Sequence, residues 1–313
     1  MMRAPESYFP IKQFGIVKAV TPVSGGLSGT NVYAVTTELG EFFLHLHGKQ
    51  EEDFGVMLTA QRLAAKEGIA PNVILVEAED GAVITEKAKG MPIGAALAQR
   101  DVRPLVLRSL AEMLARLHAI PASNIPPLDP SLGQSIWDQQ SEREGFPDWA
   151  KPLGTFINSG SAAIAQDGRR VLSHNDVNPA NLIWDGSKVW LVDWERAALA
   201  HPYMDLAIFS TFAILPVDDA VDLLAIQERS PISALQRATF LSMINYARAI
   251  YGAVFLRLVP DLTDIEFMPR EATPTLPECY ADLAKGQLNL GTPSGQAQFG
   301  AAQLRQLPVA IAP

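Results

Sequence analysis

The side chains of this sequence that are best suited to chemistry are three carboxylates, an amide and an imidazole in one short stretch. In chain order they are His174, Asp176, Asn181, Asp193 and Glu195. Carboxylate and amide oxygens are ligands of Mg²⁺, which usually keeps some waters and binds substrate phosphates as well. A further carboxylate beside such an ion can orient a hydroxyl group and accept its proton. These residue types therefore suit magnesium-assisted phosphoryl transfer.

The elements around these residues predict how they meet. Two short apolar runs, Leu182 to Trp184 and Val189 to Val192, enclose the turn Asp185-Gly186-Ser187. Apolar runs on both sides of an Asp-Gly turn predict a β-hairpin. Because a hairpin folds back on itself, we expect Asn181 before its first strand to lie near Asp193 after its second. Two carboxylates and one amide oxygen, those of the polar loop and of the hairpin end, would then reach one point.

The same stretch resembles the aminoglycoside phosphotransferase and choline kinase family, which shares the kinase fold. The resemblance rests on His174-Asn175-Asp176, Asn181, Asp193-Trp194-Glu195 and Pro202-Tyr203-Met204-Asp205-Leu206. It implies that Asp176 accepts the substrate proton and that Asn181 and Asp193 hold Mg²⁺.

Other roles in this stretch stay open. The resemblance implies that His174 orients the catalytic loop rather than carrying a proton. Glu195 contacts a metal ion, the substrate or only water. Asp193 alone could cap a turn, and Asp205 could cap the apolar helix that follows it.

Near the N-terminus, a glycine-rich loop lies between two predicted strands, Phe14 to Val20 and Asn31 to Thr36. The candidate nucleotide-binding residues of this loop are Ser24, Gly25, Gly26 and Ser28. Glycines let the backbone approach phosphates closely and present its N–H groups.

The third predicted strand, Glu41 to His47, departs from the family pattern. The family's strand Lys or Arg, which pairs with the phosphates, is replaced by His45. On the following helix, expected from Asp53 to Lys66, the family's Glu is replaced by Met57. A Glu without its cation would be a costly unpaired charge, so the two losses fit together.

Three explanations of this departure remain. His45 binds phosphate as a neutral donor or as imidazolium, Lys49 or Glu51 supplies the missing groups, or nucleotide binding is weakened or lost.

The last strands of a small sheet are expected at Val73 to Glu77 and Ala82 to Thr85. The segment after them, with Glu86 and Ala88, resembles the family's adenine-binding hinge.

The rest of the chain has helical periodicity. Helices are expected at 106–117, 132–144, 149–165, 220–228, 232–258, 276–285 and 296–307. The helix at 232–258 carries Tyr246, Tyr251 and Phe255, which are either core residues or a cage for a quaternary ammonium group.

We therefore predict an α+β, bilobal, protein-kinase-like fold. An N-lobe at residues 1–88 has a small antiparallel sheet and one helix, and a mostly helical C-lobe occupies residues 89–313. The net charge of −9 argues against a nucleic-acid partner. One cysteine excludes an internal disulfide. With no signal peptide or membrane-spanning run, a cytoplasmic protein is expected.

The predicted function is ATP- and Mg²⁺-dependent phosphorylation of a hydroxyl on a small molecule, such as an amino alcohol, a sugar or an aminoglycoside-like compound. A pseudokinase that binds a nucleotide or metabolite without turnover is the alternative suggested by His45. A metal-dependent hydrolase would need more ligands than His174 and Asp176, and the other histidines lack the spacing to supply them.

Overall fold

The computed structural model describes residues 3–23, 31–47 and 54–308, and the chain divides into two compact units. Unit 1 comprises Met1–Pro126 and Val171–Leu199, and unit 2 comprises Pro127–Arg170 and Ala200–Pro313. The described candidate residues of the catalytic stretch, of the third strand and of the hinge therefore belong to unit 1, whereas the aromatic residues of 232–258 belong to unit 2. The lobe boundary expected after residue 88 stays a prediction.

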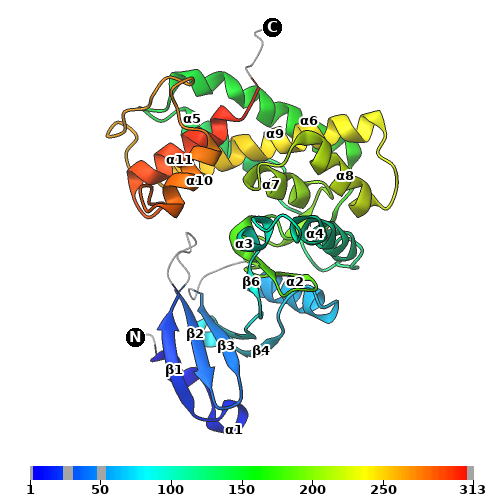
Figure 1. Cartoon of the computed structure of the whole chain (residues 1–313), viewed down its shortest axis with the longest axis vertical. Coiled ribbons are helices and arrows are strands. Elements are labelled where there is room, and N and C mark those ends of the chain that lie inside the picture. The colour runs from blue at the N-terminus through cyan, green and yellow to red at the C-terminus, as the bar shows by residue number, and fades with distance from the viewer. Residues whose placement is uncertain (1–2, 24–30, 48–53, 309–313) are drawn as a thin grey trace. The chain divides into compact units, whose positions relative to one another are not determined.

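A five-stranded antiparallel sheet forms the N-terminal part of unit 1 (Figure 1). Its spatial order is β1-β2-β3-β5-β4, with β1 at Val17–Pro22, β2 at Asn31–Thr37, β3 at Glu41–Leu46, β5 at Ala82–Glu86 and β4 at Val73–Glu77. Alternate residues of β3 point to opposite faces of the sheet. Leu44 and Leu46 join a core cluster with Tyr8, Phe9 and Phe14, so His45 lies on the other face.

The first strand begins later than the sequence predicts. Phe14 ends a short helix, α1 (Ile11–Phe14), and β1 starts at Val17. Gly15 separates the two elements with a φ of 70°, a left-handed backbone that glycine adopts without strain. The apolar run at 14–20 therefore contains a turn that its hydrophobicity does not reveal.

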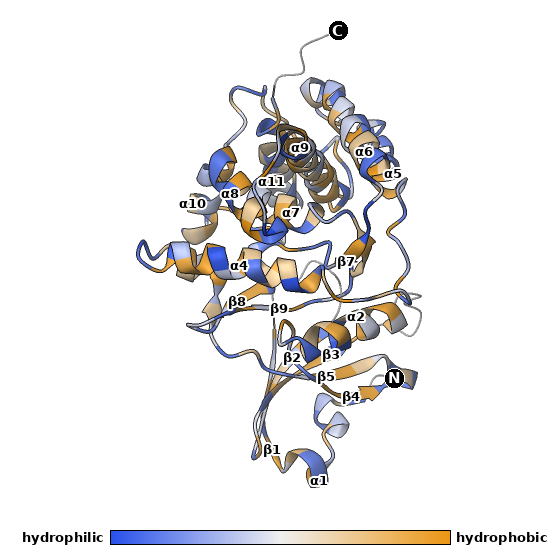
Figure 2. Cartoon of the chain, turned by 90° about the vertical axis from the view of Figure 1, so that its right-hand side faces the viewer, coloured by the Kyte–Doolittle hydropathy of each residue, from blue (hydrophilic) through white to orange (hydrophobic). Residues whose placement is uncertain are grey.

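Helices of unit 1 pack against its hairpin. Helix α2 (Phe54–Lys66) precedes β4, and α3 (Ile93–Leu97) and α4 (Arg103–Leu117) follow β6 (Met91–Pro92). The contacts of α4 include β9 (Val189–Leu191), the second strand of the hairpin, and α3 contacts β8 (Leu182–Trp184), the first. In Figure 2, α4 carries both hydrophobic and hydrophilic residues, as expected for a helix with one buried face.

Unit 2 is helical. Its helices are α5 (Leu132–Ser141), α6 (Thr155–Asp167), α7 (Met204–Phe212), α8 (Val217–Glu228), α9 (Ala234–Arg257), α10 (Leu276–Ala284) and α11 (Pro293–Arg305). The long α9 packs against α5, α6, α7 and α11 (Figure 1). It begins at a capping box in which Ser233 and Gln236 exchange hydrogen bonds.

One predicted helix of unit 2 is two elements. The segment expected as a single helix at 149–165 is a 3₁₀ helix, Asp148–Gly154, followed by α6. Pro152 lies inside the first element and has no N–H for an α-helical hydrogen bond.

The α+β class with a small antiparallel sheet and a mostly helical remainder is confirmed. Among the described residues, no helix has the length and apolar character needed to span a bilayer.

Candidate active site

The predicted hairpin is present at the predicted position in the chain. Strands β8 (Leu182–Trp184) and β9 (Val189–Leu191) pair antiparallel, with Leu182 opposite Leu191 and Trp184 opposite Val189. In the turn, the Asp185 carboxylate accepts hydrogen bonds from the backbone N–H groups of Ser187 and Lys188. The connection is therefore fixed by side chain to backbone bonds that the sequence supplies locally.

The two ends of the hairpin meet as the pattern predicts. The backbone N–H of Val192 donates to the carbonyl oxygen of Asn181 at 3.0 Å, one residue beyond the paired strands. Asn181 therefore lies beside the residue that precedes Asp193. The Asn181 side-chain Nδ2 also donates to Asp176 Oδ2 and to the Asp176 carbonyl oxygen, each at 2.9 Å. Asp176, Asn181 and Asp193 come from separate points of the chain and are gathered at one end of the hairpin.

The buried side chain of His174 packs against the residues on either side of Asp193. Its side chain is completely buried, and its Nε2 lies 3.0 Å from the carbonyl oxygen of Val192. The imidazole also packs edge-on against the ring of Trp194, with centroids 4.9 Å apart. Trp194 is itself buried and donates from Nε1 to the carbonyl oxygen of Leu191. These contacts involve the residues on both sides of Asp193 and are those expected if His174 orients this loop.

The backbone at Asp193 has a left-handed conformation, with φ at 66°. Asn175, before Asp176, has a similar φ of 62°, and its Nδ2 donates to the carbonyl oxygen of Arg196. Asn and Asp adopt this conformation more readily than other non-glycine residues, at a modest cost. One of these residues is the candidate metal ligand Asp193 itself and the other directly precedes Asp176, so both unusual backbone conformations lie at candidate site residues.

The Asp193 carboxylate is buried beside other negative charges. Burial raises its pKa, the charges of Glu195 and Asp176 raise the pKa further, and His174 lowers it. A carboxylate whose charge is disfavoured in this way gains from a cation beside it.

The donor set fits Mg²⁺. Because the Asn181 amide nitrogen faces Asp176, its amide oxygen is the atom that a metal would use, together with the carboxylate oxygens of Asp193. In the part of the chain that is described, no three His, Cys, Asp or Glu side chains are placed to hold a metal unaided. Mg²⁺ completes its shell with waters and phosphate oxygens, so few protein ligands suffice.

Glu195 has a partner from the sheet. Its Oε1 lies 3.4 Å from Nδ1 of His47, at the end of β3, and the Glu195 side chain is about one-fifth exposed. The sequence did not point to His47. The available signal was its spacing of two from His45, which puts both histidines on one face of the strand.

His45 lies within the sheet, opposite Val32 on β2 and Val83 on β5. Burial lowers the pKa of His45 to about 4, and the neighbouring His47 contributes to this shift. His45 is therefore neutral at physiological pH when no phosphate is present. Met57 on α2 is 5% exposed, and α2 contains no acidic residue.

The hinge segment is attached to the hairpin. Glu86 ends β5, Ala88 lies between β5 and β6, and Met91 of β6 pairs with Trp184 of β8. Between them, Gly90 has a φ of 137°, and a Cβ atom there would lie 2.3 Å from the carbonyl oxygen of Trp184. Only glycine fits this close approach without movement.

Some predicted positions fall elsewhere. Ser24, Gly25, Gly26 and Ser28, and the alternatives Lys49 and Glu51, lie outside the described residues. In unit 2, Tyr246 and Phe255 are buried, and the Tyr251 ring packs on Phe212 with centroids 4.7 Å apart. Tyr246 and Phe255 are therefore core residues, whereas Tyr251 is half-buried.

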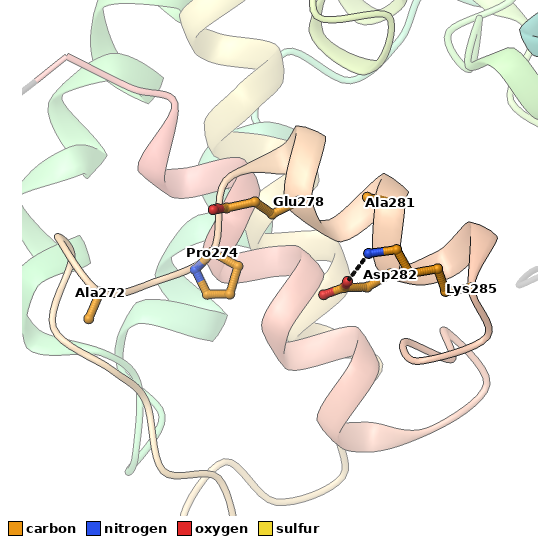
Figure 3. A pocket seen from close by; sticks show the side chains of 6 residues that line it. All are labelled: Ala272, Pro274, Glu278, Ala281, Asp282 and Lys285. Carbon is orange, nitrogen blue, oxygen red and sulfur yellow. Dashed lines mark ion pairs between the residues drawn. The ribbon is translucent and has the colours of Figure 1, made fainter.

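A surface hollow in unit 2 contains none of the predicted site residues (Figure 3). It is lined by Ala272, Pro274, Glu278, Ala281, Asp282 and Lys285. Two of these lining residues, Asp282 and Lys285, form an ion pair at 3.9 Å.

Comparison with solved structures identifies the class of fold. A choline/ethanolamine kinase family protein from Mesorhizobium loti superposes with a TM-score of 0.65 at 17% identity, covering 92% of this chain and 93% of that one. The choline kinase LicA from Streptococcus pneumoniae gives 0.61 at 15% identity over 93% and 94%, and it has also been solved in complex with AMP. The aminoglycoside phosphotransferase APH(3'')-Id from Streptomyces rimosus gives 0.52 at 18% over 73% and 92%. The fold is kinase-like.

The model of one protein family, the phosphotransferase enzyme family, matches residues 19–240. This match spans most of the chain, from β1 to the first turns of α9. The chain belongs to the phosphotransferase enzyme family, and the resemblance seen in the sequence is confirmed.

Proposed function

We propose that this protein transfers the γ-phosphoryl group of ATP to a hydroxyl group of a small molecule, with Mg²⁺ as the metal. The observation that carries the proposal is the contact between Asn181 and Asp176 at 2.9 Å, at the hairpin end that also delivers Asp193. Membership of the phosphotransferase enzyme family supports the same class of reaction.

Each residue has a distinct part in the proposed reaction. Asp176 accepts a hydrogen bond from the acceptor hydroxyl, orients its oxygen toward the phosphorus and takes up its proton. The Asn181 amide holds the Asp176 carboxylate in place through its nitrogen, and its oxygen, with Asp193, would hold the metal. When bound, Mg²⁺ neutralises the charge of the phosphates. Catalysis then depends on alignment and on charge neutralisation.

His174 and His45 have supporting parts. His174 keeps the backbone before Asp193 in position through its contact with the Val192 carbonyl oxygen. His45, neutral before the nucleotide binds, offers a ring N–H to phosphate from the centre of the sheet. We assign Glu86 and Ala88 to a hinge that would bind the nucleotide base. We assign phosphate binding to the loop with Ser24, Gly25, Gly26 and Ser28, which lies outside the described residues.

The Asp176→Asn variant tests the assignment of the proton acceptor. An Asn side chain keeps an oxygen that can accept the hydrogen bond from Asn181, but it cannot take up a proton at neutral pH. We expect phosphoryl transfer to fall by at least about a hundredfold, while Mg·ATP binding measured by calorimetry stays close to that of the natural protein. Asp148→Asn in unit 2, where the side chain is 92% exposed, is the matched control. Natural turnover by Asp176→Asn would refute the role of Asp176.

The acceptor is proposed only by class. The net charge of −9 disfavours a polyanionic partner such as nucleic acid, so we propose a small molecule with a free hydroxyl. A panel of amino alcohols, sugars and aminoglycosides, with ATP and GTP as donors, can be screened by mass spectrometry for addition of one phosphoryl group. The absence of any phosphorylated product from an adequately broad panel would favour the second candidate below.

The second candidate is a protein that binds a nucleotide or metabolite without turnover. It is favoured by two features of the chain, the neutral His45 on β3 and the buried Met57 on a helix without acidic residues. This candidate predicts that Mg·ATP raises the melting temperature but that no ATP is consumed with any acceptor. The enzyme predicts both stabilisation and acceptor-dependent consumption.

A further inference from the structure

The side chain of His47, beside the sheet, contacts Glu195 in the candidate metal-binding segment, Asp193 to Glu195. None of the sequence motifs predicts this contact. His47 follows β3, and its backbone N–H donates to the carbonyl oxygen of Gly81 at 2.9 Å. Its side chain is 3% exposed, and Nδ1 lies 3.4 Å from Oε1 of Glu195. Glu195 is two residues beyond Asp193. The contact therefore connects the central strand of the sheet to the residue pair Asp193 and Glu195.

The His47 ring is held on two sides. It lies nearly parallel to the His45 ring, with an interplanar angle of 11° and centroids 6.2 Å apart. Phe54, the first residue of α2, packs edge-on against it at 5.5 Å. A buried ring confined between two others has little freedom to turn. The direction of Nδ1 toward Glu195 is thus fixed by packing and not only by the attraction between the two groups.

This contact lies in the region where kinases have a conserved ion pair between a strand and a helix. In kinases a strand Lys pairs with a helix Glu, but here β3 offers His45 and α2 has no acidic residue. His47, directly after β3, contacts the carboxylate of Glu195, whose side chain is 20% exposed and which lies two residues beyond the candidate metal ligand Asp193. A residue directly after this strand therefore reaches the metal-binding segment.

We propose that His47 is a positioning residue that holds Glu195 beside Asp193 and fixes the metal-binding segment to strand β3. The inference rests on the proposed function for its consequence but not for the contact itself. Groups that orient a metal ligand commonly change metal affinity or activity by about 10- to 100-fold when they are removed. His47 has no part in proton transfer to or from the substrate.

The first experiment tests the contact in the protein without metal or nucleotide. The chain has five histidines, so a spectrum of protein labelled with ¹⁵N at histidine is simple, and the His47 signals are those absent from His47→Asn. We expect Glu195→Gln to shift the ring resonances of His47, while Asp148→Asn leaves them in place. Unshifted His47 resonances in Glu195→Gln would overturn the inference.

The second experiment tests the consequence by a double-mutant cycle. Affinity for Mn²⁺·ATP, measured by calorimetry, should fall about tenfold in His47→Ala. His47→Asn, which can place an amide N–H near the position of Nδ1, should recover part of the loss. His118→Ala, at the end of α4, is the control and should bind as the natural protein does.

The cycle separates positioning from a general loss of structure. If His47 acts through Glu195, then His47→Ala in a Glu195→Gln background should have much less effect than in the natural protein. Equal effects in both backgrounds, or unchanged affinity in His47→Ala, would contradict the inference. If Glu195→Gln shifts the His47 resonances but no acceptor is phosphorylated, the contact is supported and the proposed function is contradicted. If an acceptor is phosphorylated but the His47 resonances do not shift, the proposed function is supported and the contact is contradicted.

Discussion

Replacement of Gly90 by Ala should break the junction between the hinge and the hairpin. At Gly90 a Cβ atom would lie 2.3 Å from the Trp184 carbonyl oxygen and 2.9 Å from the Asp185 Cα atom. Both are backbone atoms, so no side-chain rotation can relieve the overlap. The φ of 137° is also one that alanine adopts only with strain.

The expected size of the effect follows from these two terms. A residue forced into a sparsely populated backbone conformation costs about 1–3 kcal/mol, and overpacking against a fixed neighbour costs about 1–3 kcal/mol. We therefore expect the free energy of unfolding to fall by about 3 kcal/mol. The cost exceeds that of an ordinary surface substitution, which lies within about 0.5 kcal/mol.

Urea denaturation followed by tryptophan fluorescence is a suitable assay. Three of the five tryptophans, Trp184, Trp190 and Trp194, belong to the hairpin and the residues just after it. The control is Gly94→Ala, four residues away on α3, where a Cβ atom meets nothing within 4 Å. That variant should be as stable as the natural protein or more so, by up to about 1 kcal/mol. Equal stability of Gly90→Ala and Gly94→Ala would refute the close approach of hinge and hairpin.

Three further predictions concern single residues. His45→Ala should weaken Mg·ATP binding about tenfold in calorimetry, the value of roughly one charge-assisted hydrogen bond, and unchanged affinity would exclude His45 from the nucleotide site. The hydrogen bond from Arg169 lowers the pKa of Asp167 to about 2, against its ordinary value of 3.8. Its ionised form therefore stabilises unit 2 above pH 4 and loses this effect as the pH falls toward 2. Asp167→Asn should lower the free energy of unfolding by about 2 kcal/mol at pH 6, with a smaller difference from the natural protein at pH 3, and an equal difference at both pH values would contradict this account. Burial raises the pKa of the Cys279 thiol to about 11, so iodoacetamide at pH 8 should modify it only after unfolding, and rapid modification of the folded protein would show that the thiol is accessible.

The sequence predicted the hairpin and its consequence because both depend on local chemistry. The Asp185-Gly186 turn and the apolar runs on either side determine the register. The register in turn places Asn181 next to the residue before Asp193. The resemblance predicts an orienting role for His174, but its contact with the Val192 carbonyl oxygen could not be predicted, since it depends on how the buried loop packs.

The features that the sequence did not predict depend on contacts between distant segments. The pairing of His47 with Glu195 joins residues that are far apart in the chain, and no periodic pattern marks it. The start of β1 was misplaced because the turn at Gly15 lies within a mostly apolar segment, residues 14–20. The helix expected at 149–165 was misread because its periodicity outweighed the effect of Pro152.

The most direct test of the proposed site is to locate the metal. Crystals of the protein with Mn²⁺ and a non-hydrolysable ATP analogue would reveal the ion by its anomalous scattering. We predict a peak about 2.0–2.3 Å from the side-chain oxygens of Asn181 and Asp193, with the terminal phosphate on the side of Asp176. A bound analogue whose ion has no contact with either Asn181 or Asp193 would contradict the proposed mechanism.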